Sequence, residues 1–351
     1  MIRDEILTLF IFRELRKSRC FLYMGNGMND LEPAGISDRP AVSVVLAVFN
    51  GARTIREAVE SVLDQTFSDF ELLIWNDGST DQTATIVTRY SDPRVIILGG
   101  PENTGAGLAR DAAINVARGK WIAFIDADDA WLPTRLERLM AAAGTRKDVM
   151  VFDDIMDCHD SSGGLVQWRR IRGRRAFGAV GGVPVDVGFQ DYIRQRRLLI
   201  KPLFPAQIVF TAGLHHSSYR FGEDTEYFLR LIEQGLQLIY VPEALYLYRS
   251  TAGSLSANPR RNELMLEVLV QARERMVFDT PDDMMAMDDK ITGVRREIRY
   301  APFLQALKGQ KWRAAIEMLR EHPGLLAEFL VRMQEYVPYR LHRWLHQAWG
   351  R

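Results

Sequence analysis

Between residues 42 and 125 the chain alternates short, largely apolar runs with stretches in which apolar residues recur at helical spacing. The apolar runs are typical of strands buried on both faces of a parallel sheet, and the spaced stretches predict helices. The predicted strands are residues 42–49, 71–75, 94–98 and 121–125, and the predicted helices start at Thr54, at Thr80 and at about Gly107. This βαβαβαβ order predicts a doubly wound, mostly parallel α/β sheet flanked by helices.

The pattern is less regular after Pro133. We expect a helix over 134–143, a strand around 149–152, and loops with short strands over 160–187. The segment "EDTEYFLRLIEQG" predicts a helix, two short strands follow at 236–241 and 244–248, and the chain is helical from about Pro259 to its end. We therefore divide the chain into an N-terminal extension (1–40), an α/β domain with halves 41–130 and 131–257, and a C-terminal helical region (258–351).

The overall charge points to no nucleic-acid partner, because Lys plus Arg and Asp plus Glu each number 45. Positive charge is local instead, in a stretch that we call the basic island. It comprises Arg169, Arg170, Arg172, Arg174, Arg175, Arg194, Arg196, Arg197 and Lys201.

Cysteine content and hydropathy indicate a cytoplasmic protein. The two cysteines, Cys20 and Cys158, are far apart and lie in no metal-binding motif, which fits a reducing cytosol. The apolar segment "ILTLFIF" near the N-terminus is too short to span a bilayer, so any membrane contact is expected to be peripheral.

Three carboxylates, Asp126, Asp128 and Asp129, follow the strand at 121–125. Sheets of this class bind ligands beyond the carboxyl ends of their strands. Residues i and i+2 of an extended segment share a face, so Asp126 and Asp128 are candidate ligands of Mg²⁺ or Mn²⁺. The alternative is a solvated acidic turn, with Asp129 near the start of the next helix. We expect the positive charge that compensates the cluster to arrive with the substrate.

Two further turns carry candidate binding residues. Asp77 ends the strand at 71–75 and is placed to accept hydrogen bonds from a base or ribose, although the turn "WNDGSTD" needs no ligand to explain it. The segment "NTGAGLARD" lacks the third glycine of a dinucleotide fingerprint. Its Arg110, on the first turn of the predicted helix, suits a diphosphate, and a surface ion pair is the alternative.

The helix that begins near residue 223 carries Glu223, Asp224 and Glu226 in its first turn. Acidic residues stabilise a helix N-terminus without any catalytic role. The functional interpretation is that Asp224 is a general base that removes a proton from an attacking hydroxyl. The residues alone leave both interpretations open.

Taken together and in this order, four segments resemble an inverting glycosyltransferase of family 2 with the GT-A fold. They are "SVVLAVFNGARTIREAVESVLDQTF", "WNDGSTDQT", "ENTGAGLARDAAINVARGKWIAFIDADD" and "FGEDTEYFLRLIEQG", within residues 42–250. The resemblance implies a nucleotide-sugar half (41–130) and an acceptor half (131–257). It also implies that Ala47, Phe49 and Asn50 lie at the nucleotide base and that Asp77 bonds the uracil of a UDP-sugar. Arg110 would hold the diphosphate and Asp126 would contact the ribose side of the nucleotide. Asp128 with Asp126 would bind the metal, and Asp224 would be the general base.

The chain departs from the family pattern at several positions. Phe49 stands where the family usually has Tyr, so a stacking ring remains without its hydroxyl, and Asp111 stands where Asn is usual. The Q-x-x-R-W motif of processive members is absent, since the nearest match, "RLHRW", has Arg340 in place of Gln. The segment "YLYRSTAGSLS" resembles bacterial exopolysaccharide enzymes of the succinoglycan type, which implies that Arg249 closes over the donor phosphates.

The resemblance implies metal-dependent, non-processive transfer of one sugar from a nucleotide-diphosphate donor, with Mn²⁺ or Mg²⁺ as cofactor. The expected acceptor is a glycan or a lipid-linked oligosaccharide of exopolysaccharide or cell-surface polysaccharide synthesis. The basic island and the aromatic C-terminal end (Tyr339, Trp344, Trp349) suggest peripheral contact at the inner membrane face, and packing on the domain is the alternative. A sugar-nucleotide nucleotidyltransferase and a non-catalytic scaffold remain as other functions.

Overall fold

The computed structural model describes residues 39–161, 164–173, 175–214, 219, 221–250, 260–327 and 329–330. The predictions about the N-terminal extension, the loop after Ser250 and the aromatic C-terminal end lie outside the described residues. The predicted domain boundary near residue 258 falls within the undescribed stretch 251–259 and stays a prediction.

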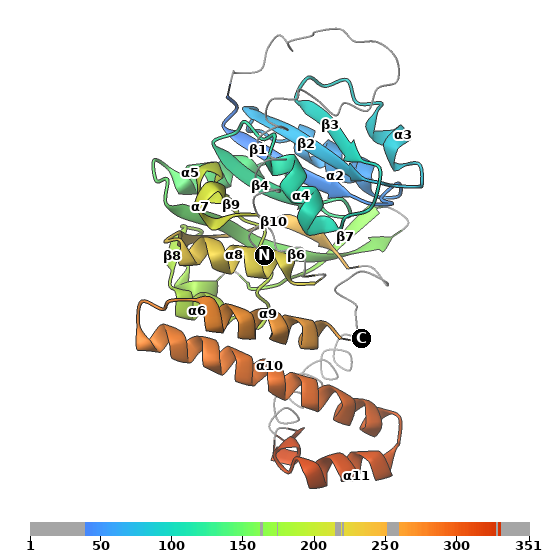
Figure 1. The fold of residues 1–351 in the computed structure, drawn as a ribbon, viewed down its shortest axis with the longest axis vertical. Helices are drawn as coiled ribbons and strands as arrows, with labels where there is room; N and C mark the ends of the chain where they lie inside the picture. Colours follow the sequence, from blue (N-terminus) through green and yellow to red (C-terminus); the bar gives the residue numbers. More distant parts are fainter. Residues whose placement is uncertain are drawn as a thin grey trace, which may run out of the picture.

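The first half of the domain has the predicted βαβαβαβ order. Its four strands pair in parallel in the order β3-β2-β1-β4, at one side of a ten-stranded sheet. The elements are β1 (Val42–Val48), α2 (Ile55–Leu63), β2 (Phe70–Asp77), α3 (Thr83–Val87), β3 (Val95–Gly100), α4 (Ala106–Ile114) and β4 (Trp121–Asp126). Figure 1 shows these strands side by side with α4 across one face.

The second half continues the same sheet with mixed strand directions, in the order β4-β9-β6-β10-β5. Strand β10 runs parallel to β6, whereas β9 is antiparallel to β4 and β6. The elements are β5 (Ala130–Trp131), α5 (Arg135–Ala143), β6 (Val149–Ser161), β7 (Gly164–Arg170), η1 (Ala176–Gly178), β8 (Val185–Val187), α6 (Phe189–Ile193), β9 (Leu203–Pro205), η2 (Ala206–Ile208), α7 (Val209–Ala212), α8 (Glu223–Glu233) and β10 (Gln237–Arg249).

Two apolar cores form the two faces of the sheet. On one face α2 and α5 bury residues such as Val59 and Leu136 against the strands. On the other face α4 and α8 bury residues such as Ala113 and Phe228. The strands between them are apolar on both faces because both faces are covered, which confirms the predicted α/β class.

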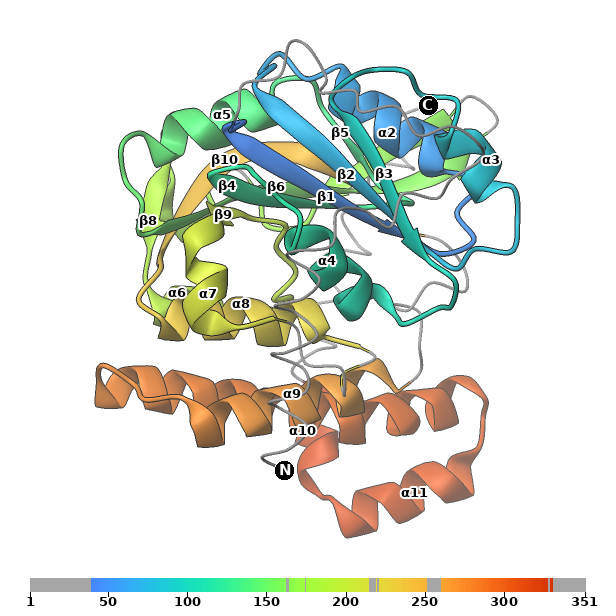
Figure 2. The same ribbon diagram turned by 45° about the horizontal axis from the view of Figure 1, so that its top comes forward.

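The C-terminal helices are α9 (Arg261–Arg275), α10 (Pro281–Lys308) and α11 (Trp312–Glu321). Helix α9 and the first part of α10 extend the second core, whereas α11 packs with the later part of α10 in a small core of its own. Figures 1 and 2 show α9 and α10 side by side, beyond α8 on the side away from the sheet. Leu269 and Met287 are fully buried in this layer, so these two helices pack on the domain. No helix among the described residues is long and apolar enough to cross a membrane.

Two local predictions are wrong: the start of the second predicted helix, and the place of Arg110 on the first turn of the third. Helix α3 begins at Thr83, not at Thr80, because the Asp81 carboxylate accepts the Thr83 N–H at 2.9 Å while Ser79 accepts the Asn50 N–H. Helix α4 begins at Ala106, which puts Arg110 in its second turn.

Two strands are longer than predicted. Strand β6 continues to Ser161 through carboxylates that are buried and ion-paired, Asp153 with Arg135 and Asp154 with Arg170, both pairs within 3 Å. The two short strands predicted at 236–248 are one strand, β10, with register shifts between Val241 and Tyr246. The shifts keep one strand paired where the apolar pattern is interrupted.

Candidate active site

The carboxyl ends of β1 and β4 bring several predicted site residues to one edge of the sheet. Ala47 of β1 pairs with Trp75 of β2 on one side and with Asp126 of β4 on the other. Helix α4 presents Arg110 to this edge, and the N-terminus of α8 presents Asp224. The parallel register therefore gathers residues that lie far apart in the sequence.

Asp126 lies between two cations of the same chain. Its Oδ1 is 2.7 Å from Arg110 Nη2, and its Oδ2 is 2.6 Å from Lys201 Nζ. Burial opposes ionisation of this carboxyl, but Lys201 and Arg110 outweigh burial and hold its pKa well below the usual range. The prediction that the compensating charge comes with the substrate is thus wrong for Asp126.

The same two cations reach the N-terminus of α8. Arg110 Nη1 lies 3.2 Å from Glu223 Oε1, and Lys201 Nζ lies 3.4 Å from Asp224 Oδ2. We call Asp126, Asp128, Glu223 and Asp224 the acidic cluster. Its four carboxylates face two cations, which leaves a net charge of −2 when all are ionised.

Asp128 is the member of the cluster whose carboxylate forms no hydrogen bond or ion pair with another described residue. Burial and the neighbouring charge of Asp126 raise its pKa. A divalent cation would relieve both effects, so Asp128 fits a metal ligand. Mg²⁺ is commonly held by one or two carboxylates, substrate phosphates and water.

Asp126 is a less open ligand than Asp128, because both of its oxygens already accept charge-assisted hydrogen bonds. Among the described residues no group of three or more His, Cys, Asp or Glu side chains is arranged to hold a metal by itself. A metal here would therefore need oxygens from a bound substrate, and the role of Asp126 as a second ligand stays a prediction.

Asp129 braces the turn after β4 and does not help to start a helix, since α5 begins only at Arg135. Its carboxylate is buried and accepts hydrogen bonds from the Tyr246 hydroxyl at 2.7 Å and from the Arg249 N–H at 2.8 Å. Burial and the charges of Asp126 and Asp128 raise its pKa well above the usual range. The same Tyr246 hydroxyl accepts the Asp126 N–H, which ties β10 to both ends of the turn.

The predicted nucleotide-binding residues lie at the same edge but have partners of their own. The Asp77 carboxylate is 2% exposed and accepts hydrogen bonds from Thr104 and Gly105, so it braces the turn before α4. Asn50 accepts the Thr80 N–H at 2.8 Å and adopts a φ of 51°. Phe49 is 47% exposed at the end of β1, where its ring is accessible for stacking. Their contacts to a base stay predictions.

Arg249 occupies a fixed position beneath the turn that carries Asp128. Its Nε donates to the Asp128 carbonyl oxygen at 2.6 Å, and its other nitrogens pair with Asp160 and Glu57. With 4% of its side chain exposed, Arg249 positions the turn in this structure. Contact with donor phosphates would require it to leave these partners, so that predicted role remains a prediction.

Comparison with known proteins identifies the fold and the family. The family model described as "Glycosyl transferase family 2" matches residues 43–203, which include β1 to β4, Asp126, Asp128 and Lys201. Residues 43–203 therefore form a family 2 glycosyltransferase domain, and the protein is a glycosyltransferase. This assignment favours sugar transfer over the nucleotidyltransferase and scaffold alternatives.

The glycosyltransferase has curated relatives over most of its length. It is 26% identical over 302 residues to the succinoglycan biosynthesis protein ExoO of Rhizobium meliloti, covering 84% of this chain and 86% of that protein. It is 25% identical over 243 residues to WfaP of Escherichia coli, covering 67% and 90%. That protein is named UDP-Glc:alpha-D-GlcNAc-diphosphoundecaprenol beta-1,3-glucosyltransferase.

Solved structures confirm the GT-A fold of the glycosyltransferase. Residues 1–349 of S. aureus TarS superpose with a TM-score of 0.58 at 17% identity, covering 79% of each chain. The same protein in complex with UDP-GlcNAc gives a TM-score of 0.59 at 18% identity, covering 81% of each chain.

Sequence reasoning missed Lys201 as a site residue of the glycosyltransferase. It was assigned only to the basic island, yet its ammonium group is buried and paired with Asp126 and Asp224. The signal was a single lysine within the apolar run "LLIKPLF". Arg135 holds this residue in place by donating to its carbonyl oxygen while pairing with Asp153.

Proposed function

We propose that the glycosyltransferase transfers one sugar from a UDP-sugar to a hydroxyl group of a glycan or lipid-linked acceptor, with inversion and with a divalent cation. The observation that carries the proposal is the acidic cluster. Its Asp128 carboxylate has no ion-pair partner among the described residues, while the other three carboxylates pair with Arg110 and Lys201. Carboxylates left with net negative charge favour a donor that arrives with a cation.

The donor side of the reaction uses Asp128 and Arg110. Mn²⁺ or Mg²⁺ at Asp128 would supply charge compensation for the departing diphosphate. Arg110 is buried and oriented by Asp126 and Glu223, so its guanidinium is preorganised beside the position that a diphosphate would take. Phe49 offers an exposed ring for the base.

Asp224 acts as the base on the acceptor side. Its Oδ2 lies 3.4 Å from Lys201 Nζ, which orients the carboxylate that accepts the proton. The acceptor hydroxyl gives its proton to Asp224 as its oxygen forms the new bond to the anomeric carbon, and the bond to the UDP oxygen breaks. One in-line displacement of this kind inverts the anomeric centre.

The names of relatives support the substrate classes. WfaP is named for a UDP-glucose donor and a diphosphoundecaprenol-linked acceptor, ExoO for succinoglycan biosynthesis, and TarS has been crystallised with UDP and with UDP-GlcNAc. By this analogy we place the chain in exopolysaccharide or cell-surface polysaccharide synthesis. Cytoplasmic location with peripheral contact at the inner membrane face belongs to the same proposal.

The proposal is tested by nucleotide release from a panel of UDP-, GDP- and dTDP-sugars with Mn²⁺, with and without EDTA. We expect release from a UDP-sugar that EDTA abolishes, and NMR of the product should show the inverted anomer. Asp128→Asn and Asp224→Asn should each lower turnover by about 10²–10⁴-fold, whereas Asp148→Asn, at an exposed aspartate, should not. Turnover that EDTA leaves unchanged would contradict the proposed metal dependence. A fully active Asp224→Asn enzyme would contradict the role of Asp224 as the general base.

A further inference from the structure

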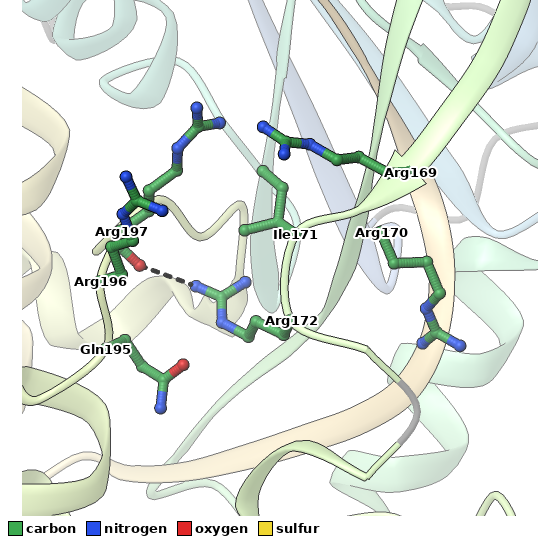
Figure 3. Close-up of a pocket in the computed structure, with 7 residues that line it drawn as sticks. All are labelled: Arg169, Arg170, Ile171, Arg172, Gln195, Arg196 and Arg197. Atoms are coloured by element: carbon green, nitrogen blue, oxygen red, sulfur yellow. Dashed lines mark hydrogen bonds between the residues drawn. The ribbon is translucent and has the colours of Figure 1, made fainter. Parts of the chain in front are cut away.

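Part of the basic island folds into a small pocket on the acceptor half. The pocket has a volume of about 160 Å³ and lies between the end of β7 and the segment at 195–197. Figure 3 shows Arg169 and Arg172 on one side, Arg196 and Arg197 on the other, and Ile171 between them. We call it the arginine pocket.

The arginines that border the pocket differ in their distances to acidic partners. Arg170 also borders it but points away, with its guanidinium 2.9 Å from the Asp154 carboxylate. Arg169 and Arg197 approach a single carboxylate, that of Asp157, at 3.7 and 3.9 Å. The distance from Arg197 exceeds that of a direct hydrogen bond, so its guanidinium retains donors for a further anion.

Arg172 gives the most specific indication that the pocket binds an acceptor of hydrogen bonds. Its Nη2 donates to the Leu199 carbonyl oxygen at 2.6 Å, but its Nε and Nη1 are buried and have no hydrogen-bond partner among the described residues. Figure 3 shows this guanidinium in the middle of the pocket. Buried donors of a charged group that lack a partner destabilise a fold, so a bound acceptor of hydrogen bonds is expected at this position.

The size and chemistry of the arginine pocket fit a phosphate or diphosphate group. Its volume of about 160 Å³ is below the roughly 300–1,000 Å³ of pockets that enclose drug-sized ligands. It therefore does not enclose a whole nucleotide sugar. Guanidinium groups bind phosphate oxygens through paired, charge-assisted hydrogen bonds, and several guanidiniums face this one space.

The arginine pocket lies close to the acidic cluster. Arg197 precedes Lys201 by four residues, so their Cα atoms are at most about 14 Å apart even if the chain is fully extended. On the other side, Asp157 accepts a hydrogen bond from Ser250, the residue after Arg249, which contacts Asp128. The pocket is thus within reach of a molecule whose hydroxyl group lies at Asp224.

The C-terminal region supports the wall of the arginine pocket. Lys290 of α10 donates from Nζ to the Gln195 carbonyl oxygen at 2.5 Å and to that of Arg196 at 3.3 Å. These contacts involve the backbone of the segment and leave the arginine side chains available. Helix α10 therefore fixes the backbone position of residues 195–197, which form one wall of the pocket.

We propose that the arginine pocket binds the phosphate or diphosphate group of the acceptor, at a position separate from that of the donor diphosphate. This inference rests on the proposed function, because it assigns the pocket to the second substrate of the same reaction. Anchoring that group would place the sugar attached to it toward Asp224. Binding here is non-covalent and needs no metal.

Direct binding of farnesyl diphosphate in EDTA tests the inference without requiring turnover. We compare the wild type with the Arg196→Ala/Arg197→Ala double variant and with Arg194→Ala, an exposed arginine of the same segment that does not line the pocket. The double variant should bind at least about tenfold more weakly, and Arg194→Ala within about twofold of the wild type. Equal affinity in all three proteins would overturn the inference.

Two further measurements separate the other sources of phosphate. Affinity for UDP with Mn²⁺ should be the same in the double variant and the wild type. If the double variant loses affinity for UDP as well as for farnesyl diphosphate, the pocket belongs to the donor and the inference is overturned. Binding to phosphatidylglycerol vesicles tests whether the pocket binds lipid headgroups of the membrane. If the double variant loses vesicle binding but binds farnesyl diphosphate as the wild type does, the assignment to an acceptor is overturned. Loss of farnesyl diphosphate binding alone supports it.

The binding results distinguish a failure of the inference from a failure of the proposed function. If no donor is turned over but the variants show the expected binding pattern, the proposed reaction fails and only the binding of a diphosphate group in the pocket stands. If turnover follows the predictions for Asp128 and Asp224 but the double variant binds farnesyl diphosphate normally, only the pocket assignment fails.

Discussion

The acidic cluster and the arginine pocket lie near one another but differ in how their charges are arranged. In the acidic cluster, Arg110 and Lys201 are buried and each bridges two carboxylates. In the arginine pocket, Arg169 and Arg197 are about half exposed and share one distant carboxylate. The first arrangement suits a diphosphate that brings its own cation, and the second suits a phosphate group without one.

This difference suggests how one enzyme distinguishes two substrates that both carry phosphate. A metal-bound diphosphate is attracted to the net negative charge around Asp128, which repels a metal-free one. A metal-free diphosphate is attracted to the guanidiniums of the arginine pocket. Each site then contributes to selectivity by what it rejects as well as by what it binds.

The largest expected effect comes from Lys201→Met, which breaks the acidic cluster. Without the ammonium group, Asp126 and Asp224 lose a shared partner, so turnover should fall by about 10²–10³-fold and the free energy of unfolding by about 3–5 kcal/mol. Lys120→Met, at an exposed lysine, is the matched control. Nucleotide release and thermal unfolding measure the two effects; wild-type values for both would contradict the assigned role of Lys201.

The next effect distinguishes the sites by pH. In the proposed function the metal binds the ionised form of Asp128, whose pKa is raised by burial and by Asp126. Below that raised pKa a proton competes with the cation, so Mn²⁺ affinity measured with UDP should fall by about tenfold per pH unit, beginning above the usual pKa of an aspartate. Asp128→Asn should bind Mn²⁺ weakly and show no such slope. A wild-type affinity that is constant down to the usual aspartate pKa would contradict this prediction.

A smaller effect is expected for Lys290→Met, which removes the contacts between α10 and the backbone of residues 195–197 at the arginine pocket. Farnesyl diphosphate affinity should fall by about three- to fivefold, because the segment at 195–197 loses two backbone contacts. Lys308→Met, an exposed lysine of the same helix, should leave the affinity unchanged.

Lys290 also gives a pH dependence of stability. Burial lowers its pKa from 10.5 to about 8 in the folded protein. Between pH 8 and 10.5 the unfolded chain therefore binds a proton that the folded chain does not, so this group makes folding more favourable as pH rises. Relative to Lys290→Met, the wild type should gain up to about 3 kcal/mol over this range in denaturant titrations, at about 1.4 kcal/mol per unit of pKa shift. A difference that stays constant with pH would contradict the lowered pKa.

The smallest effect sharpens the contrast between the two sites. Asp157→Asn removes the carboxylate that Arg169 and Arg197 share, and it keeps the side-chain shape. Farnesyl diphosphate affinity should rise by about two- to threefold, since the guanidiniums then have no competing anion there. Asp148→Asn should change nothing. A lower affinity in Asp157→Asn would show that this carboxylate orients the arginines more than it competes with the ligand.

Much of the first half of the fold was predictable because its strands are buried on both faces. The runs that became β1 to β4 are largely apolar, and the spacing of their helices is regular, so pattern and structure agree. Strand β6 was only partly predictable. Its later residues are carboxylates whose burial depends on Arg135 and Arg170, which the local pattern does not reveal.

The candidate site was predictable to a similar extent. Asp126, Asp128 and Asp224 follow local rules, since they end a strand or start a helix, and the structure brings Asp126 and Asp224 to opposite sides of one ammonium group. Lys201 and the arginine pocket depend on contacts between distant segments. For the same reason, sequence alone did not reveal that Asp77 and Arg249 already bind Thr104 and Asp160.

The contacts of Lys290 have a consequence for how the enzyme can diversify. They bind carbonyl oxygens, which every amino acid provides, so the wall of the arginine pocket keeps its place whatever side chains it carries. Residues 195–197 can accordingly be exchanged without loosening the segment, while the chemistry at Asp128 and Asp224 stays intact. Libraries at these three positions should alter acceptor choice independently of donor choice, which makes this short stretch the natural place to redesign the enzyme.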